Sequence, residues 1–360
     1  MKIELLGDIK TVMSNPGSQH NYFGWPTVCR LQNGKIAAVA SGFRIDHVCP
    51  FGKTVIAYSE DEGESFTSPA PVIDTVLDDR DGGIMTFGDE GVIVTSFNNT
   101  VAFQRSYAEK YTHNAYALAY LDTVTAEAER DALGATYRIS HDCGVTFGPL
   151  RKSPITSPHG PTALGDGRIL WVGRLYDRSE LADGEHEIEV HEITADGEMK
   201  KLAEIAPIHG LLSCEPHMVE ATDGTLLTHI RVQEGGGATG ERTFTVYQSE
   251  SSDGGSTWTA PHKILSDLGG APSHILRAQD GRLIATYGYR EAPYGIRMAV
   301  STDHGKSWVC DYEIYVNGVS LDIGYPSTVE LKDGSFLTVF YAHRTPAEPA
   351  TILSQRWKFV

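Results

Sequence analysis

Tyrosine, carboxylate, arginine and histidine side chains recur at the ends of short apolar runs along this chain. A tyrosine oxygen, with a pKa of about 10, attacks only when a neighbouring carboxylate takes its proton. An arginine binds a carboxylate through two parallel hydrogen bonds, which fixes the orientation of the bound group. The runs begin near Trp25, Asp81, His159, Glu215, His217, His274 and Tyr325, and they end near Arg44, Arg174, Arg231, Arg290 and His343. This set predicts an active site on one rim of a rigid scaffold.

Four copies of an eight-residue turn motif indicate how such a rim is built. The pattern is Ser-x-Asp-x-Gly-x-Ser/Thr-aromatic, and the copies begin at Ser59, Ser140, Ser251 and Ser301. Aspartate bonds nearby backbone N–H groups, glycine takes the positive φ of a tight turn, and the aromatic ring anchors the turn on the sheet below. A motif that recurs at this spacing predicts a repeat architecture.

A second repeat consists of hairpins. Six segments share an apolar run, a glycine-containing turn and another apolar run: 25–39, 84–97, 161–172, 216–230, 272–287 and 325–340. An Asn-Gly or Asp-Gly pair between such runs is the strongest short-range signal for a hairpin, and the runs are too short for ordinary helices. The hairpins predict an all-β fold, a six-bladed β-propeller of four-stranded blades that forms a single domain over residues 1–360.

Three departures from the repeat carry their own predictions. The copy of the turn motif in the third blade is reduced to Ala195-Asp196-Gly197. The sixth blade begins at Tyr325 and lacks length for four strands, so residues 3–12 are expected to supply its outer strand and close the ring. Residues 102–138 form an insertion in the second blade, in which 123–133 is expected to fold as one short helix.

Composition excludes several classes of function. The net charge is −17, without basic clusters, which argues against nucleic acid and anionic membranes as partners. No apolar stretch reaches the roughly 20 residues of a membrane span, and the N-terminus lacks the apolar core of a signal peptide, so we expect a cytoplasmic protein. Five dispersed cysteines favour reduced thiols, and the sequence shows no metal-binding signature and implies no cofactor. The oligomeric state is not indicated.

Together the turns and the rim residues resemble the sialidase (neuraminidase) superfamily, the BNR or Asp-box propellers, over essentially the whole chain. The matching segments are 214–220, which holds Glu215; Arg231, one hairpin later; Arg297, ahead of the turn at Ser301; and Tyr325 in Gly324-Tyr325-Pro326-Ser327. The resemblance implies that Tyr325 is the nucleophile, that Glu215 is its base, and that Arg231 and Arg297 bind the substrate carboxylate. It also implies that Arg44 lines the same pocket and that the turn motifs are structural.

The chain departs from that family at two places. An arginine is expected where Phe23-Gly24-Trp25-Pro26 opens the first blade, and the acid is expected in a loop that here is short. In that loop Asp46 or His47 would have to serve as the acid. Alternatively, the acidic segment 77–83, which holds Asp81, supplies the acid or bonds sugar hydroxyls. Histidines are also frequent on the rim, among them His159 and His217, and imidazole is a common acid or base near neutral pH.

Three functions are compatible with these residues. The first is an exo-acting glycoside hydrolase that releases a terminal acidic sugar, sialic acid or a related ulosonic or uronic acid, from an oligosaccharide or glycoconjugate. The second is a polysaccharide or uronic-acid lyase that moves a proton with the rim histidines and Tyr325. The third is a carbohydrate-binding propeller without catalysis. A lyase product absorbs near-ultraviolet light and a hydrolase product does not, so one assay separates them.

Overall fold

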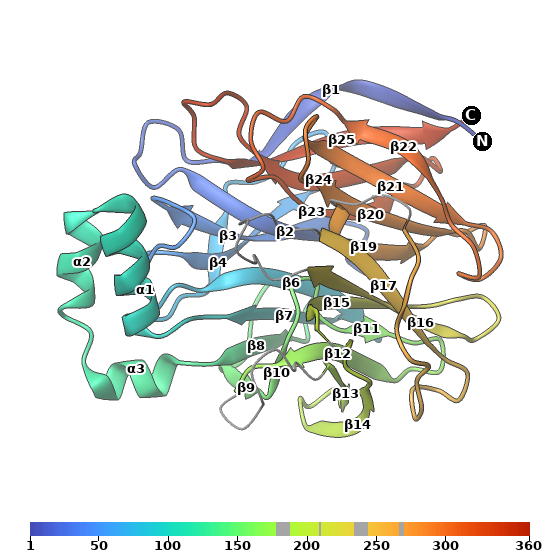
Figure 1. Cartoon of the computed structure of the whole chain (residues 1–360), viewed down its shortest axis with the longest axis horizontal. Coiled ribbons are helices and arrows are strands. Elements are labelled where there is room, and N and C mark those ends of the chain that lie inside the picture. Colours follow the sequence, from blue (N-terminus) through green and yellow to red (C-terminus); the bar gives the residue numbers. More distant parts are fainter. Residues whose placement is uncertain (178–187, 209, 234–243, 266–269) are drawn as a thin grey trace.

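Six antiparallel sheets are arranged as the blades of a propeller (Figure 1). The computed structural model describes the chain except for residues 178–187, 209, 234–243 and 266–269. The first strands of neighbouring blades pack against one another, so these strands are the innermost. The six-bladed β-propeller predicted from the hairpins is confirmed.

The first three blades follow one another along the chain. Blade one contains β2 (Tyr22–Arg30), β3 (Ile36–Arg44), β4 (Lys53–Ser59) and β5 (Ala70–Ile73). Blade two contains β6 (Arg80–Phe87), β7 (Gly91–Phe97), β8 (Ala135–Ser140) and β9 (Arg151–Ser153). Blade three has a divided inner strand and contains β10 (Ile155–Thr156), β11 (Thr162–Ala163), β12 (Ile169–Leu175), β13 (Ile188–Ile193) and β14 (Met199–Ile205).

The remaining blades complete the ring. Blade four contains β15 (Leu212–Glu220), β16 (Leu226–Gln233), β17 (Phe244–Ser251) and β18 (His262–Lys263). Blade five contains β19 (Gly270–Arg277), β20 (Leu283–Tyr289), β21 (Gly295–Ser301) and β22 (Val309–Tyr315). Blade six contains β23 (Gly324–Glu330), β24 (Phe336–Ala342), β25 (Thr351–Phe359) and, as its outer strand, β1 (Ile3–Met13). The expected closure by the N-terminal strand is confirmed, and both chain ends lie together in Figure 1.

Each of the four turn motifs is held by its own serine and aspartate. In the first, Asp61 accepts hydrogen bonds from Ser59 Oγ (2.8 Å) and from the Ser65 backbone N–H (2.9 Å), while Ser59 Oγ accepts from the Gly63 N–H (2.9 Å). The motifs join the third strand of a blade to its fourth. Their terminal rings pack onto buried clusters: Phe66, Phe147, Trp258 and Trp308. At 195–197 a tight hairpin between β13 and β14 replaces the motif.

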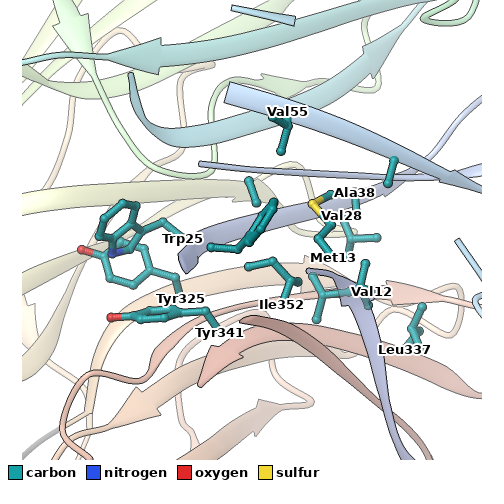
Figure 2. Packing of buried hydrophobic residues seen from close by; sticks show 14 of the residues in the cluster. Val12, Met13, Trp25, Val28, Ala38, Val55, Tyr325, Leu337, Tyr341 and Ile352 are labelled. Carbon is teal, nitrogen blue, oxygen red and sulfur yellow. The ribbon is translucent and has the colours of Figure 1, made fainter. Parts of the chain in front are cut away.

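Buried side chains fill the space between blades. Figure 2 shows one such cluster between blades one and six, in which Val12 and Met13 of β1 pack near Leu337 and Ile352. Because the closing strand contributes to this cluster, it joins the core as well as the sheet. At the opposite end of the same cluster the rings of Trp25, Tyr325 and Tyr341 lie together, which places the predicted nucleophile on a packed wall.

The insertion in blade two forms more helix than expected. It contains α1 (Val101–Tyr107), a π-helical turn η1 (Ala108–Thr112), α2 (Ala115–Leu121) and α3 (Ala126–Ala132), where one helix at 123–133 was predicted. The helices project from one side of the propeller (Figure 1). In the described part of the chain, none is long and apolar enough to cross a membrane.

Candidate active site

The inner strands of four blades carry the same backbone irregularity near one end. Trp25, Asp81, Glu215 and Tyr325 have φ values of 55°, 49°, 50° and 47°, which side chains other than glycine rarely adopt. In each strand two residues stand opposite one on the neighbouring strand, as in a β-bulge. A bulge re-aims a side chain, and such strain concentrates at functional sites. The repeat therefore places these four side chains at equivalent points around the centre.

Glu215, Tyr325 and Arg231 form one hydrogen-bonded group. The Tyr325 hydroxyl donates to Glu215 Oε1 at 2.7 Å, within the reach required of a nucleophile and its base. Arg231 Nη1 donates to Glu215 Oε2 at 2.6 Å and to the Tyr325 oxygen at 3.2 Å. Arg231 Nη2 donates to Gln233 Oε1 at 2.8 Å, which orients the guanidinium. The sequence prediction that these three residues converge agrees with this geometry.

Burial and charge keep the Tyr325 phenol protonated. Burial raises its pKa well above the ordinary value, and the neighbouring Glu215 carboxylate raises it further, whereas Arg231 lowers it. A neutral phenol does not repel an anionic substrate. It becomes a nucleophile only as the proton moves to Glu215, whose oxygen already accepts that hydrogen bond.

A second arginine stands beside the nucleophile. The Arg290 guanidinium lies 5.4 Å from the centre of the Tyr325 ring and 5.5 Å from that of Phe244. Arg231 lies over the same Phe244 ring, at 4.9 Å, so the two positive charges are close together. Arg290 is held by the Ile323 carbonyl at 3.0 Å and the Tyr341 hydroxyl at 3.3 Å.

The described contacts of Arg297 are with residues of its own blade, and its predicted role as a carboxylate ligand stays a prediction. Arg297 lies on β21. Its guanidinium is 3.5 Å from the centre of the Tyr289 ring and 3.6 Å from Glu313. β21 is the third strand of its blade, further from the centre than β19 and β20. Arg290 follows β20, and its guanidinium is the second one beside the Tyr325 group.

Asp81 shares a cavity with Glu215. The cavity has a volume of about 930 Å³, and both carboxyl groups line it. Burial raises the pKa of Asp81 to about 7; the charge of Arg80 opposes this shift and that of Glu215 adds to it. Asp81 Oδ1 is buried without a hydrogen-bond partner among the described residues. A carboxyl whose pKa is raised by burial can hold a proton near neutral pH and can therefore serve as an acid.

The Trp25 ring is buried beside the Tyr325 ring. The guanidinium groups of Arg44 and Arg80 lie 4.8 Å and 4.0 Å from the centre of this ring. Arg44 is fully buried and pairs with Asp78 at 2.5 Å. The predictions that Trp25 and Arg44 contact substrate are therefore wrong, because burial removes both from the pocket. The Asp79 carboxylate accepts hydrogen bonds from the Thr75 backbone N–H and hydroxyl. Of the segment 77–83, Asp81 is the carboxyl residue that lines the cavity.

Asp322 was missed by the sequence reasoning and joins four other side chains into one network. Its carboxylate accepts from the hydroxyls of Tyr22 (2.8 Å) and Tyr341 (3.0 Å), and lies 3.2 Å from His47 Nδ1 and 3.0 Å from His343 Nε2. These bonds lower the pKa of Asp322 although burial opposes them. Because Tyr341 also holds Arg290, the network positions the arginine beside the nucleophile. Its one sequence signal was the place of Asp322 shortly before Tyr325.

Neither acid candidate of the short loop lines the cavity that Asp81 shares with Glu215. Asp46 uses Oδ1 to accept the backbone N–H of His47 at 2.6 Å. His47 is tied to Asp322 through Nδ1, and burial lowers its pKa. Asp81 lies with Glu215 in the cavity lining, whereas the choice of Asp46 or His47 as the acid stays a prediction.

Comparison with known proteins agrees with the repeat and the fold. Residues 98–338 match the model of the BNR repeat-like domain. The chain belongs to the BNR repeat-like family. No curated protein matches its sequence.

Three solved structures are similar to this BNR repeat-like protein along almost their whole length. A protein of unknown function from Dyadobacter fermentans has a TM-score of 0.77 at 21% identity, over 99% of both chains. An intramolecular trans-sialidase from Ruminococcus gnavus has a TM-score of 0.66 at 14% identity, over 97% of both chains. The α-L-arabinofuranosidase Arb93A from Fusarium graminearum has a TM-score of 0.67 at 11% identity, over 97% of this chain and 96% of its own. At these identities the likeness concerns the fold, which is that of the sialidases.

Three of the rim histidines line a different space. His159, His217 and His274 are buried, with ring centres 4.6–5.3 Å apart, and line a separate cavity of about 330 Å³. His217 Nδ1 accepts the Ile275 N–H at 3.0 Å, and His274 Nδ1 accepts the Thr328 N–H at 3.4 Å, so each ring joins its blade to the next. The predictions that His159 and His217 bind substrate are therefore wrong. His217 lies two residues beyond the Glu215 bulge, and His159 Nδ1 lies 3.1 Å from the Thr27 hydroxyl of blade one, so both link neighbouring blades.

The burial of these histidines predicts that the folded state loses stability as the pH falls. Burial lowers the pKa of His217 well below its ordinary value, so the folded state holds it neutral. The stability that neutral His217 contributes is fully present above about pH 6.5, the pKa of histidine in the unfolded chain. Below that pH the free energy of unfolding falls by about 1.4 kcal/mol per pH unit. Asp79 and Asp81, with pKa values raised to about 7, act in the opposite direction between about pH 7 and 4.

A matched variant isolates the histidine effect. His217→Asn retains an acceptor for the Ile275 N–H but does not titrate. Urea unfolding of both proteins between pH 7 and 4.5 should therefore show a shallower decline for the variant. Parallel curves would show that His217 does not supply the acid sensitivity.

Proposed function

We propose that this protein is an exo-acting glycoside hydrolase that releases a terminal acidic sugar. The observation that carries the proposal is the 2.7 Å hydrogen bond from Tyr325 to Glu215, with Arg231 bridging both. The Tyr325 oxygen attacks the anomeric carbon as its proton passes to Glu215, and the bond to the leaving oxygen breaks. Asp81 gives its proton to that oxygen. Water then gives a proton to Asp81 and attacks the anomeric carbon, while the Tyr325 oxygen leaves and regains its proton from Glu215, which gives retention of configuration.

The charges around the nucleophile support an acidic substrate. Arg231 and Arg290 place two positive charges beside the same Phe244 ring, and Glu215 compensates one of them. Among the described residues, Arg290 uses Nε and Nη2 but makes no hydrogen bond through Nη1, so one edge remains for a ligand. A sugar carboxylate between the two guanidinium groups would neutralise the excess charge. Sialic acid and related ulosonic or uronic acids carry such a group.

The histidines that would transfer the proton in a lyase have other partners or lie in another cavity. Three of the five rim histidines are buried in the separate cavity, and the other two, His47 and His343, are tied to Asp322. Tyr325 alone would have to remove and return a proton, with a phenol whose pKa burial raises. The hydrolase uses the same pair without requiring a free phenolate.

Product analysis tests the proposal directly. The protein is incubated with sialyllactose and with a uronic-acid oligosaccharide, and the products are separated by anion-exchange chromatography and followed by NMR. We expect a free acidic monosaccharide whose anomeric configuration is first that of the substrate. A product that absorbs in the near ultraviolet would establish the lyase instead, and binding without turnover would establish a carbohydrate-binding propeller.

A further inference from the structure

A second cavity lies at the end of the inner strands opposite the candidate active site. It has a volume of about 330 Å³, within the range of small-molecule sites, and His159, His217 and His274 line it. Its lining follows β2, β15 and β19 to their last residues. The bulges at Glu215 and Tyr325 lie near the first residues of β15 and β23. The two cavities therefore belong to opposite faces of the propeller.

Two of the three histidines carry an N–H group that no neighbour uses. His217 Nδ1 accepts the Ile275 N–H at 3.0 Å, and His274 Nδ1 accepts the Thr328 N–H at 3.4 Å. Burial lowers the pKa of both rings well below the ordinary value, so each ring is neutral and carries one proton. Because Nδ1 is the acceptor in each ring, that proton is on Nε2. Neither Nε2 atom has a hydrogen-bond partner among the described residues.

His159 supplies an acceptor instead of a donor. The Thr27 hydroxyl donates to the Pro158 carbonyl at 3.2 Å, so its oxygen can accept from His159 Nδ1, 3.1 Å away. This bond places the single proton of the neutral ring on Nδ1 and leaves a lone pair on Nε2. His159 Nε2 is buried, and within the described part of the chain it has no hydrogen-bond partner. A buried polar atom left in this state costs free energy, which a bound group that donates to it would recover.

The charged groups of the lining balance one another. Arg30 donates to the Glu62 carboxylate through two hydrogen bonds, at 2.9 and 2.7 Å. Glu220 lies 3.9 Å from Arg277 and accepts the Gly165 N–H at 2.7 Å. Apolar residues of the lining belong to the clusters packed between blades: Val28, Ile84, Met218 and Ile275. With neutral imidazoles and paired charges, the cavity favours a neutral polar ligand over an anion.

One hydroxyl group matches the three imidazoles. A hydroxyl oxygen accepts two hydrogen bonds and donates one, which corresponds to the N–H groups of His217 and His274 and the lone pair of His159. A metal ion would need a lone pair from each ring, and two of the rings carry a proton on Nε2 instead. Among the residues that the structure describes, no group of side chains is placed to hold a metal ion.

We propose that this cavity binds a small neutral polyhydroxy compound, a polyol or a single sugar, through one hydroxyl group held by His159, His217 and His274. The site is separate from the reaction proposed above. Its occupant contacts neither Tyr325 nor Glu215, so binding and turnover can be measured independently.

NMR of the histidine side chains tests this site without any turnover. The protein carries isotope-labelled histidine, and the ring nitrogens are followed during titration with glycerol, D-xylose, D-glucose and D-galactose. Before titration, His217 and His274 should be protonated on Nε2 and His159 on Nδ1. At least one of the four compounds should then shift all three rings to saturation. His191, which is bonded to Glu189 on a middle strand of blade three, should not shift.

Three variants locate the bound compound. His159→Phe leaves the ligand hydroxyl without its acceptor and should raise Kd about tenfold or more. Ala163→Trp places an indole at an exposed position of the lining, so it should block the cavity without disturbing the core. Ala195→Trp is its control, at an exposed position of the β13–β14 hairpin that is not part of the described lining, and should leave Kd unchanged.

Several results would overturn the proposal. Absence of shifts with all four compounds would show that the cavity holds water alone, and shifts with inorganic phosphate only would show an anion site. Zinc that displaces the Nε2 protons would show a metal centre. Shifts confined to His47 and His343 would place the ligand at the other mouth, and equal affinity of Ala163→Trp and the wild type would place it elsewhere. Loss of the hydrolase proposal would change none of these readings.

Discussion

Replacing Tyr325 by phenylalanine is expected to lower kcat on the preferred glycoside on the order of 10³-fold or more. The change removes the one oxygen that both contacts Glu215 and can form the bond to the sugar. It also removes the hydrogen bond to Arg231, so the free energy of unfolding should fall by about 1 kcal/mol. Initial rates and urea unfolding of the purified variant measure the two effects separately.

A second tyrosine provides the control for that variant. Tyr58→Phe removes a hydroxyl that donates to the Gly144 carbonyl, between the outer parts of blades one and two. Its kcat should equal that of the wild type. Near-normal turnover by Tyr325→Phe would show that another group attacks the sugar, and it would remove the mechanism proposed for this site.

Replacing Glu215 by glutamine is expected to lower kcat about 10²- to 10⁴-fold, because an amide cannot take the phenol proton. The Tyr325→Phe, Glu215→Gln double variant should be little worse than either single one, since both residues serve one step. Glu220→Gln changes a carboxylate on the same strand that accepts the Gly165 N–H, and it should leave kcat unaffected. Fully multiplicative losses in the double variant would show that Glu215 acts independently of Tyr325.

The sequence predicted most of the fold because each blade repeats one local pattern. Hairpin turns and the serine–aspartate motifs are read from neighbouring residues, and their bonds in the structure are local as well. The short helices α1 and α2 were missed because seven residues give little periodicity and their aromatic residues favour strands. Their N-caps, Thr100 and Asn114, were the signal present in the sequence.

The sequence predicted the part of the site that lies at the repeated bulge of the inner strands. Glu215 and Tyr325 begin inner strands, and the same left-handed backbone turns both side chains toward each other. The role of Arg297 stays a prediction, because spacing to the next turn does not say how far a strand lies from the centre. Asp322 could not be found from spacing, since its partners come from blades one and six and meet only after the ring closes.

Trapping the covalent intermediate tests the central claim most directly. The reagent is a glycosyl fluoride of the acidic sugar that product analysis identifies, with a second fluorine beside the anomeric carbon to slow hydrolysis. The account predicts that the Tyr325 oxygen displaces fluoride as Glu215 takes its proton, so mass spectrometry of the digested protein should find the sugar on the peptide that contains Tyr325. Attachment to an aspartate or glutamate, or release of an inverted product without any adduct, would contradict it.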